Sequence, residues 1–112
     1  MTERRRHPRA TVDLGAWLVW EHTSQSVVIR NIGTGGALII APDLEVPVRG
    51  RIQVDFSLGH GRIAVDAAVR HCPRPGWLGV DFLGLSAETI REIEHYVERH
   101  HATERVKGHA PG

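Results

Sequence analysis

A strict alternation of apolar and polar positions is the feature that most constrains the fold of this chain. In residues 52–58, 63–69 and 77–82, every second residue is apolar. One face of a further segment carries Val12, Leu14, Ala16, Leu18 and Trp20. Successive side chains of a strand point to opposite faces, so these segments predict strands with one buried face. The chain is therefore predicted to be all-β over most of its length.

Short loops separate the predicted strands. Two apolar runs, "SVVIRN" and "GALIIA", flank a glycine-rich turn and raise the number of strands to about six. Loops as short as "HTSQ", "GHG" and "RPG" favour antiparallel hairpins that close into a small barrel. If "HTSQ" joins the first two strands, Asn31 lies opposite Ala16. The N-terminal segment then passes beside the turn formed by residues 31–36.

The pattern changes at Ser86, where "SAETIREIEHYVERHH" predicts one amphipathic helix. Ile90, Ile93 and Val97 form its apolar stripe, which is expected to cover one opening of the barrel. Ser86 suits the N-cap, and Glu88 is favourable at the positive end of the helix dipole. We predict a flexible basic arm over residues 1–10, a barrel plus helix over residues 11–101, and a disordered tail over residues 102–112.

Positive charge is concentrated at the N-terminus. Four arginines and one glutamate give residues 1–9 a net charge of +3, whereas the whole chain carries only +1. A local charge suits a small anionic ligand better than a long nucleic-acid track. The single cysteine, Cys72, excludes an internal disulfide and fits a cytoplasmic protein. Neither a signal peptide nor an apolar membrane span is recognisable, so no membrane insertion is expected.

The two unusual stretches of the sequence are predicted to meet in space. Arg4, Arg5 and Arg9 offer planar, permanently charged groups suited to phosphate and to guanine edges. The turn offers the Asn31 amide and three glycines, Gly33, Gly35 and Gly36, which allow a ligand to approach the backbone closely. These seven residues are the candidate ligand-binding site. Taken singly, a basic run is more often a solvated tail and a glycine turn a plain hairpin connection.

Together the two stretches resemble the signature of the PilZ domain family. Arg5-Arg6-His7-Pro8-Arg9 corresponds to its Arg-x-x-x-Arg segment, and Asn31-Ile32-Gly33-Thr34-Gly35-Gly36 to its Asp/Asn-x-Ser-x-x-Gly turn. "GVDFLGLS", residues 79–86, is similar to the family's last strand leading into its helix. The resemblance covers roughly residues 3–100. It implies a six-stranded antiparallel barrel that binds cyclic di-GMP, a bacterial second messenger.

The resemblance also implies a role for each site residue. Arg5 and Arg9 would contact the ligand's phosphates and guanine faces, and Arg4 would help to hold a second, stacked ligand molecule. Asn31 would read a guanine edge or orient an arginine, and Gly36 would make room for the base. Gly33 departs from the family, because serine is expected there. The loss of one hydrogen bond from that hydroxyl costs about 1 kcal/mol.

The expected function is a non-enzymatic cyclic di-GMP receptor. Its arginine-rich arm would become ordered on the ligand and signal through contacts with a downstream protein. One alternative is an adaptor of the same fold that binds proteins independently of the ligand, because Gly33 replaces the serine. Another is a barrel that binds single-stranded nucleic acid, which the near-neutral charge disfavours.

No cofactor, metal site or catalytic residue is predicted. His95, His100 and His101 lack the spacing of zinc ligands, and Cys72 beside His71 has no further ligands nearby in the sequence. Ser57, Ser86 and Cys72 have no recognisable catalytic partner. Trp17 and Trp20 fall on opposite strand faces, so at least one is expected to point away from the core. An exposed Trp17 or Trp77 would mark a partner surface.

Overall fold

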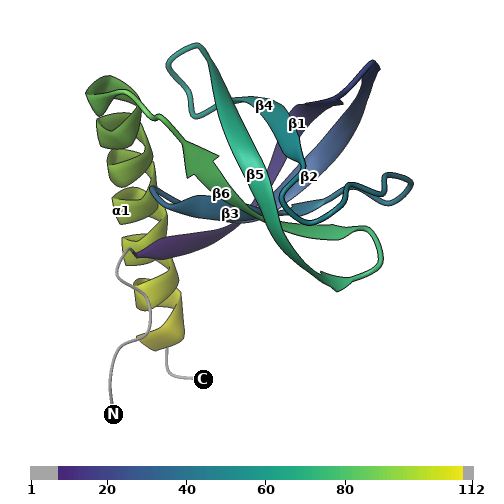
Figure 1. Cartoon of the computed structure of the whole chain (residues 1–112). Helices are drawn as coiled ribbons and strands as arrows, with labels where there is room; N and C mark the ends of the chain where they lie inside the picture. The colour runs from purple at the N-terminus through teal and green to yellow at the C-terminus, as the bar shows by residue number, and fades with distance from the viewer. Residues whose placement is uncertain (1–7, 110–112) are drawn as a thin grey trace.

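The computed structural model describes residues 8–109, with side chains described as far as residue 100. It confirms the predicted fold, a closed antiparallel barrel of six strands followed by one helix (Figure 1). The strands follow one another around the barrel in the order β1-β2-β3-β6-β5-β4. The elements are β1 (Arg9–Trp20), β2 (Thr23–Gly33), β3 (Gly36–Ile40), β4 (Arg51–Ser57), β5 (Arg62–Arg74), β6 (Trp77–Leu83) and α1 (Ala87–His109).

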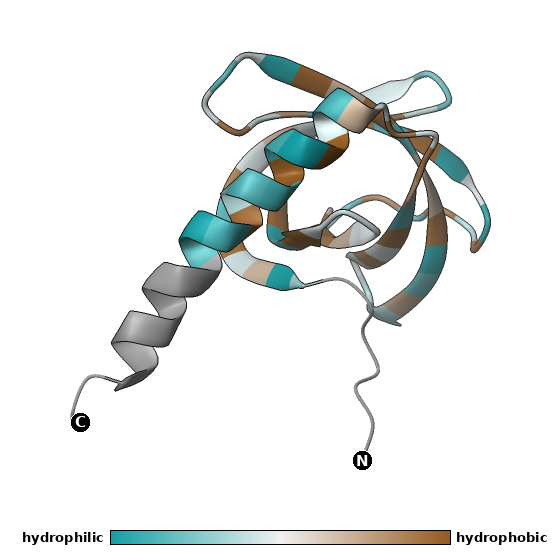
Figure 2. Cartoon of the chain, turned by 90° about the vertical axis from the view of Figure 1, so that its left-hand side faces the viewer, coloured by the Kyte–Doolittle hydropathy of each residue, from teal (hydrophilic) through white to brown (hydrophobic). Residues whose placement is uncertain are grey.

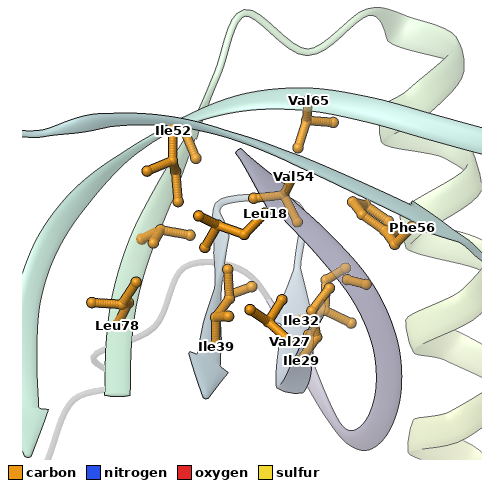
Figure 3. Packing of buried hydrophobic residues seen from close by; sticks show 14 of the residues in the cluster. Leu18, Val27, Ile29, Ile32, Ile39, Ile52, Val54, Phe56, Val65 and Leu78 are labelled. Carbon is orange, nitrogen blue, oxygen red and sulfur yellow. The ribbon is translucent and has the colours of Figure 1, made fainter. Parts of the chain in front are cut away.

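The alternating apolar residues point into the barrel and form its core. Figure 3 shows side chains from different strands converging there, among them Leu18 of β1, Ile39 of β3 and Val54 of β4. These three side chains are fully buried. No charged or polar residue is buried within the described part of the chain. Removal of this apolar surface from water is the main source of the barrel's stability.

The register of β1 and β2 differs from the prediction. The connecting turn is only Glu21–His22, and Trp20 already pairs with Thr23. Consequently Ala16 lies opposite Val27, and the predicted pairing of Asn31 with Ala16 is wrong. Glu21 has a φ of 54°, which is uncommon for a residue other than glycine. This left-handed backbone matches the tight turns that join twisted antiparallel strands, so pairing continues to the strand ends.

The shorter turn moves the start of β1 along β2. With a bulge between Thr11 and Leu14, the register places Asn31 opposite Thr11 and Arg9 opposite Gly33. Arg9 and Ala10 fall within the predicted arm but are strand residues, and Ala10 is fully buried.

The helix begins as its sequence predicts. The Thr89 backbone N–H donates a hydrogen bond to the Ser86 hydroxyl at 3.1 Å, so Ser86 is the N-cap. Ile93 and Val97 are buried in the same core cluster as the inward strand residues. The apolar side of α1 faces the barrel in Figure 2, and the helix packs against β1 and β2.

The helical backbone continues to His109, beyond the boundary predicted at residue 101. Tyr96 packs beside His100 on α1. The pKa of Tyr96 is raised above its usual value, because the effect of burial outweighs the opposite effect of the positive charge on Arg99.

Within residues 8–109, no helix has both the length and the apolar character that crossing a bilayer requires.

Candidate functional site

Arg9 and Asn31 meet on the outer face of the barrel. They come from neighbouring strands, because the β1–β2 register places Asn31 opposite Thr11, two residues from Arg9 on the same strand. The Arg9 guanidinium donates a hydrogen bond from Nη1 to the Asn31 side-chain oxygen at 2.9 Å. The asparagine therefore orients the arginine. Arg4 and Arg5 lie outside the described residues.

The glycine turn lies close to the N-terminal segment. A Cβ atom at Gly33 would lie 2.6 Å from the Pro8 carbonyl oxygen and 3.0 Å from Arg9 Cγ. Both distances are shorter than side chains normally tolerate, so glycine at this position allows the backbone before β1 to lie against the turn. Glycine in place of the serine expected from the resemblance therefore has two effects. The hydroxyl group is absent, and the Pro8 backbone can lie closer to the turn.

Gly35 and Gly36 lie directly against the backbone of β6. The Gly35 carbonyl accepts a hydrogen bond from the Phe82 backbone N–H at 2.9 Å. A Cβ at Gly36 would collide with the Val80 carbonyl oxygen and lie 3.2 Å from Asp81 Cα. The resemblance implied that Gly36 makes room for a base. In this structure the space is occupied by the backbone of β6.

Beside Arg9 and Asn31 the outer face is hollowed by a groove of about 290 Å³, here called the ligand groove. Its floor follows one row of paired residues, in which Asn31 lies opposite Leu38, Leu38 opposite Gly79, and Gly79 opposite His71. The row crosses β2, β3, β6 and β5. The groove is lined by Arg9, Asn31, Ala37, Leu38, Arg70, His71, Pro73, Gly79, Val80 and Asp81.

Gly79 determines where the His71 ring lies. A Cβ at this glycine would lie 2.7 Å from His71 Nδ1, so the imidazole rests directly on the β6 backbone. The β5–β6 register shifts on both sides of His71, which indicates bulges that turn this side chain outward. The groove therefore presents a flat, polar ring beside the apolar Leu38 side chain.

Charge in and around the groove is mainly positive. Arg70 faces Asp81 with 3.5 Å between Nη1 and Oδ1, and both side chains are largely exposed. Exposed ion pairs of this kind contribute little, so an anionic ligand can compete for the arginine. Arg30, which precedes Asn31, pairs with Asp13 at 2.9 Å and is partly neutralised by it. Arg9 and Arg70 are the cations that line the groove itself.

Arg70, His71 and Asp81 were not predicted from the sequence. They join the groove only because β5 and β6 are neighbours in the barrel. The available signal was Gly79, an outward position inside a strand, since glycine there often marks close approach of another group.

The groove has the chemistry of a nucleotide site. Guanidinium groups bind phosphate or guanine with paired hydrogen bonds and stack on planar rings. An asparagine amide and an imidazole add directional polar contacts. Among the residues that the structure describes, no group of three or more histidines, cysteines and acidic residues could hold a metal ion.

Comparison with known proteins identifies the fold. The family model for the PilZ domain matches residues 3–99. Similar solved structures include the motility inhibitor MotI/DgrA of Bacillus subtilis, with 18% identity and a TM-score of 0.80, over 93% of this chain and 54% of that protein. The PilZ domain of Escherichia coli YcgR with c-di-GMP has 16% identity and a TM-score of 0.75, over 96% of this chain and 99% of that domain.

A third similar structure is that of Borreliella burgdorferi PlzA in complex with c-di-GMP. It has 18% identity and a TM-score of 0.68, over 85% of this chain and 41% of that protein. The chain thus spans about half of MotI/DgrA and less of PlzA. A comparison with curated protein sequences finds no match. At identities this low, the structural likeness establishes the fold.

Proposed function

The chain belongs to the PilZ domain family, and from this premise we propose that it is a receptor for cyclic di-GMP, which it binds in the ligand groove. The observation that carries the proposal is the Arg9–Asn31 hydrogen bond beside a groove lined by a second arginine. Two of the similar structures, YcgR and PlzA, contain c-di-GMP. Proteins of this family act as ligand-binding receptors, and we assign no catalytic activity to the groove.

Each side chain has a distinct role in the proposed complex. Arg9, held by Asn31, approaches a phosphate or a guanine edge with two N–H groups in fixed directions. Arg70 leaves its exposed pairing with Asp81 and contributes a second positive charge. His71 offers its ring face to a base. Arg4 and Arg5 close over the ligand from the other side, and the ordered arm then presents a new surface to a downstream protein in the bacterial cytoplasm.

The proposal predicts a specific rise in thermal stability. At a cyclic di-GMP concentration of about 100 times Kd, binding stabilises the folded chain by about 2.7 kcal/mol. Since each kcal/mol raises Tm by about 4–8 °C for a domain of this size, the expected rise is roughly 10–20 °C. Thermal unfolding with GTP and with cyclic GMP provides the controls, and neither should match the effect. Equal shifts with all three nucleotides, or none with cyclic di-GMP, would contradict the proposal.

A second candidate function is a PilZ-fold adaptor that contacts proteins without using the nucleotide. Gly33 favours it, because the serine hydroxyl of the family turn is missing and the Pro8 carbonyl leaves little space for its Cβ. This candidate predicts no thermal shift with cyclic di-GMP.

Replacing Gly33 with serine is expected to weaken cyclic di-GMP binding rather than strengthen it. The new Cβ would push the Pro8–Arg9 backbone from the turn and disturb the Arg9–Asn31 contact. Loss of one hydrogen bond, about 1 kcal/mol, corresponds to roughly a 5-fold higher Kd. Isothermal titration of Gly33→Ser beside Gly33→Ala, which adds the same Cβ without the hydroxyl, separates the two effects.

Similar losses in both Gly33 variants would assign the effect to the Cβ. Tighter binding by Gly33→Ser than by the natural chain would show that the hydroxyl outweighs the displaced backbone. Absence of binding in all three proteins would favour the adaptor.

A further inference from the structure

Four apolar side chains lie along neighbouring strands on the outer face of the barrel, with Gly15 between two of them. In the register, Val28 lies opposite Ile40, and Ile40 lies opposite Trp77. On the other side, Val28 lies opposite Gly15, and Trp17 follows Gly15 on the same face of β1. We name this row the outer strip: Trp17, Val28, Ile40 and Trp77. It crosses β1, β2, β3 and β6.

The outer strip is not needed for the core. The inward neighbours of its residues, such as Leu18 and Ile39, are already fully buried. Trp17 retains 47% of its exposure and Val28 retains 37%. Gly15, between them on the surface, has no atom within 4 Å of its Cβ position, so nothing in the described chain covers this part of the strip. Outward positions of β4 and of the first part of β5 instead carry charged, polar and small residues. An apolar row confined to neighbouring strands is a feature of interaction surfaces.

Arginines stand at both ends of the outer strip. The Arg74 guanidinium carbon lies 4.8 Å from the centre of the Trp77 ring. At the other end, Arg62 lines the same surface hollow of about 370 Å³ as Trp17. Neither arginine forms an ion pair with a carboxylate within residues 8–100. Asp55 also lines this hollow and lies directly opposite Trp17 in the β1–β4 register, so its carboxylate offsets the charge of Arg62 at this end. Arg74, at the Trp77 end, keeps its charge without an ion pair among residues 8–100, and it favours a partner with acidic residues at that end.

The outer strip lies directly beside the ligand groove. Leu38 of the groove and Ile40 of the strip are alternate outward residues of β3, as are Gly79 and Trp77 of β6. Alternate residues of a strand are about 7 Å apart. A partner on the strip would therefore touch the edge of the groove.

We propose that the outer strip is the docking surface for a partner-protein segment that carries apolar side chains and one acidic end. This docking surface rests on the proposed function in one respect: the signal that the docked partner receives is cyclic di-GMP binding in the ligand groove. The apolar side chains bury against Trp17, Val28, Ile40 and Trp77, and the acidic end pairs with Arg74. Groove occupancy is then sensed by a segment lying next to it.

The test uses the three tryptophan indole N–H signals of the full chain labelled with ¹⁵N. The probe is a 12-residue peptide with leucines along one helical face and glutamates at one end, about 18 Å long as a helix. The signals of Trp17 and Trp77 should move on titration, whereas that of Trp20, which packs against the core, should stay in place. Val28→Ser should raise the peptide Kd at least 5-fold. Val48→Ser, which changes an exposed valine outside the strip, should leave it unchanged.

Several results would overturn the docking proposal. The first is that the Trp17 and Trp77 indole signals do not move at millimolar peptide. The second is that a peptide with lysines in place of the glutamates binds as tightly as the original peptide. The third is that a 12-residue oligothymidylate moves the Trp17 and Trp77 signals selectively. Movement of the same two signals when the chain is concentrated without peptide would show that a second copy of the chain binds the outer strip, and this would also overturn the docking proposal. The Asn31 side-chain amide reports cyclic di-GMP independently. Nucleotide binding without peptide binding rejects only the docking surface, and the reverse rejects only the receptor function.

Discussion

Replacing Arg9 with alanine should weaken cyclic di-GMP binding by about 10-fold to 100-fold. Hydrogen bonds to charged groups contribute about 1.5–3 kcal/mol, and each 1.4 kcal/mol is a factor of ten in Kd. The Arg9 side chain, which lines the groove, is held in place by its 2.9 Å hydrogen bond to Asn31. Isothermal titration calorimetry measures the change. Lysine at position 9 should recover only part of the affinity, because an ammonium group lacks the planar pair of donors.

Arg51→Ala is the matched control for Arg9→Ala. Arg51 is an exposed residue of β4 and does not line the ligand groove. Arg51→Ala removes the same positive charge as Arg9→Ala. A comparable loss of cyclic di-GMP affinity in Arg51→Ala would show that the loss in Arg9→Ala comes from the net charge of the domain and not from a specific contact. Urea unfolding of both variants verifies that neither change disturbs the barrel. Unchanged affinity in Arg9→Ala would remove the proposed binding mode.

Replacing Gly36 with alanine should cause the largest loss of stability. The new Cβ would occupy the position of the Val80 carbonyl oxygen, and a strand backbone can yield only by separating β3 from β6. Overpacking costs about 1–3 kcal/mol, and contact with backbone places this site at about 3 kcal/mol. With about 4–8 °C in Tm for each kcal/mol, the melting temperature should fall by more than 10 °C.

Gly15→Ala separates this steric effect from the general effect of removing a glycine. Gly15 also lies in a strand, yet its Cβ position is open. Alanine there should leave the free energy of unfolding unchanged or raise it by up to about 1 kcal/mol, because the unfolded chain loses freedom. Urea denaturation of both variants gives the comparison. Equal stabilities for Gly36→Ala and Gly15→Ala would show that β6 accommodates the methyl group.

The barrel could be predicted because its signals are local. Alternation identifies the buried face of each strand, and Ser86 marks the start of the helix through the hydrogen bond that it accepts from Thr89. The β1–β2 register could not be predicted in the same way. It depends on Glu21 adopting a φ of 54°, and glutamate carries no signal for that conformation.

One half of the candidate site could be predicted from local sequence signals, and the other half could not. Arg9 and Asn31 belong to short motifs whose order and spacing are visible in the chain, and the first hairpin brings them together. Arg70, His71 and Asp81 reach the groove through the pairing of β3 with β6 and of β6 with β5. Which strands become neighbours when a barrel closes is decided by the packing of the whole core, and no local residue pattern records it.

Closure of the barrel also limits how other chains can bind. Each strand already has a hydrogen-bonded neighbour on both sides, with β1 and β4 joined through Trp17–Val19 and Gln53–Asp55. A ring of this kind has no terminal strand. Sheet extension by a peptide, and the templated stacking that leads to fibrils, both begin on such a strand. The outward side chains are therefore the main surface that this domain offers to another protein.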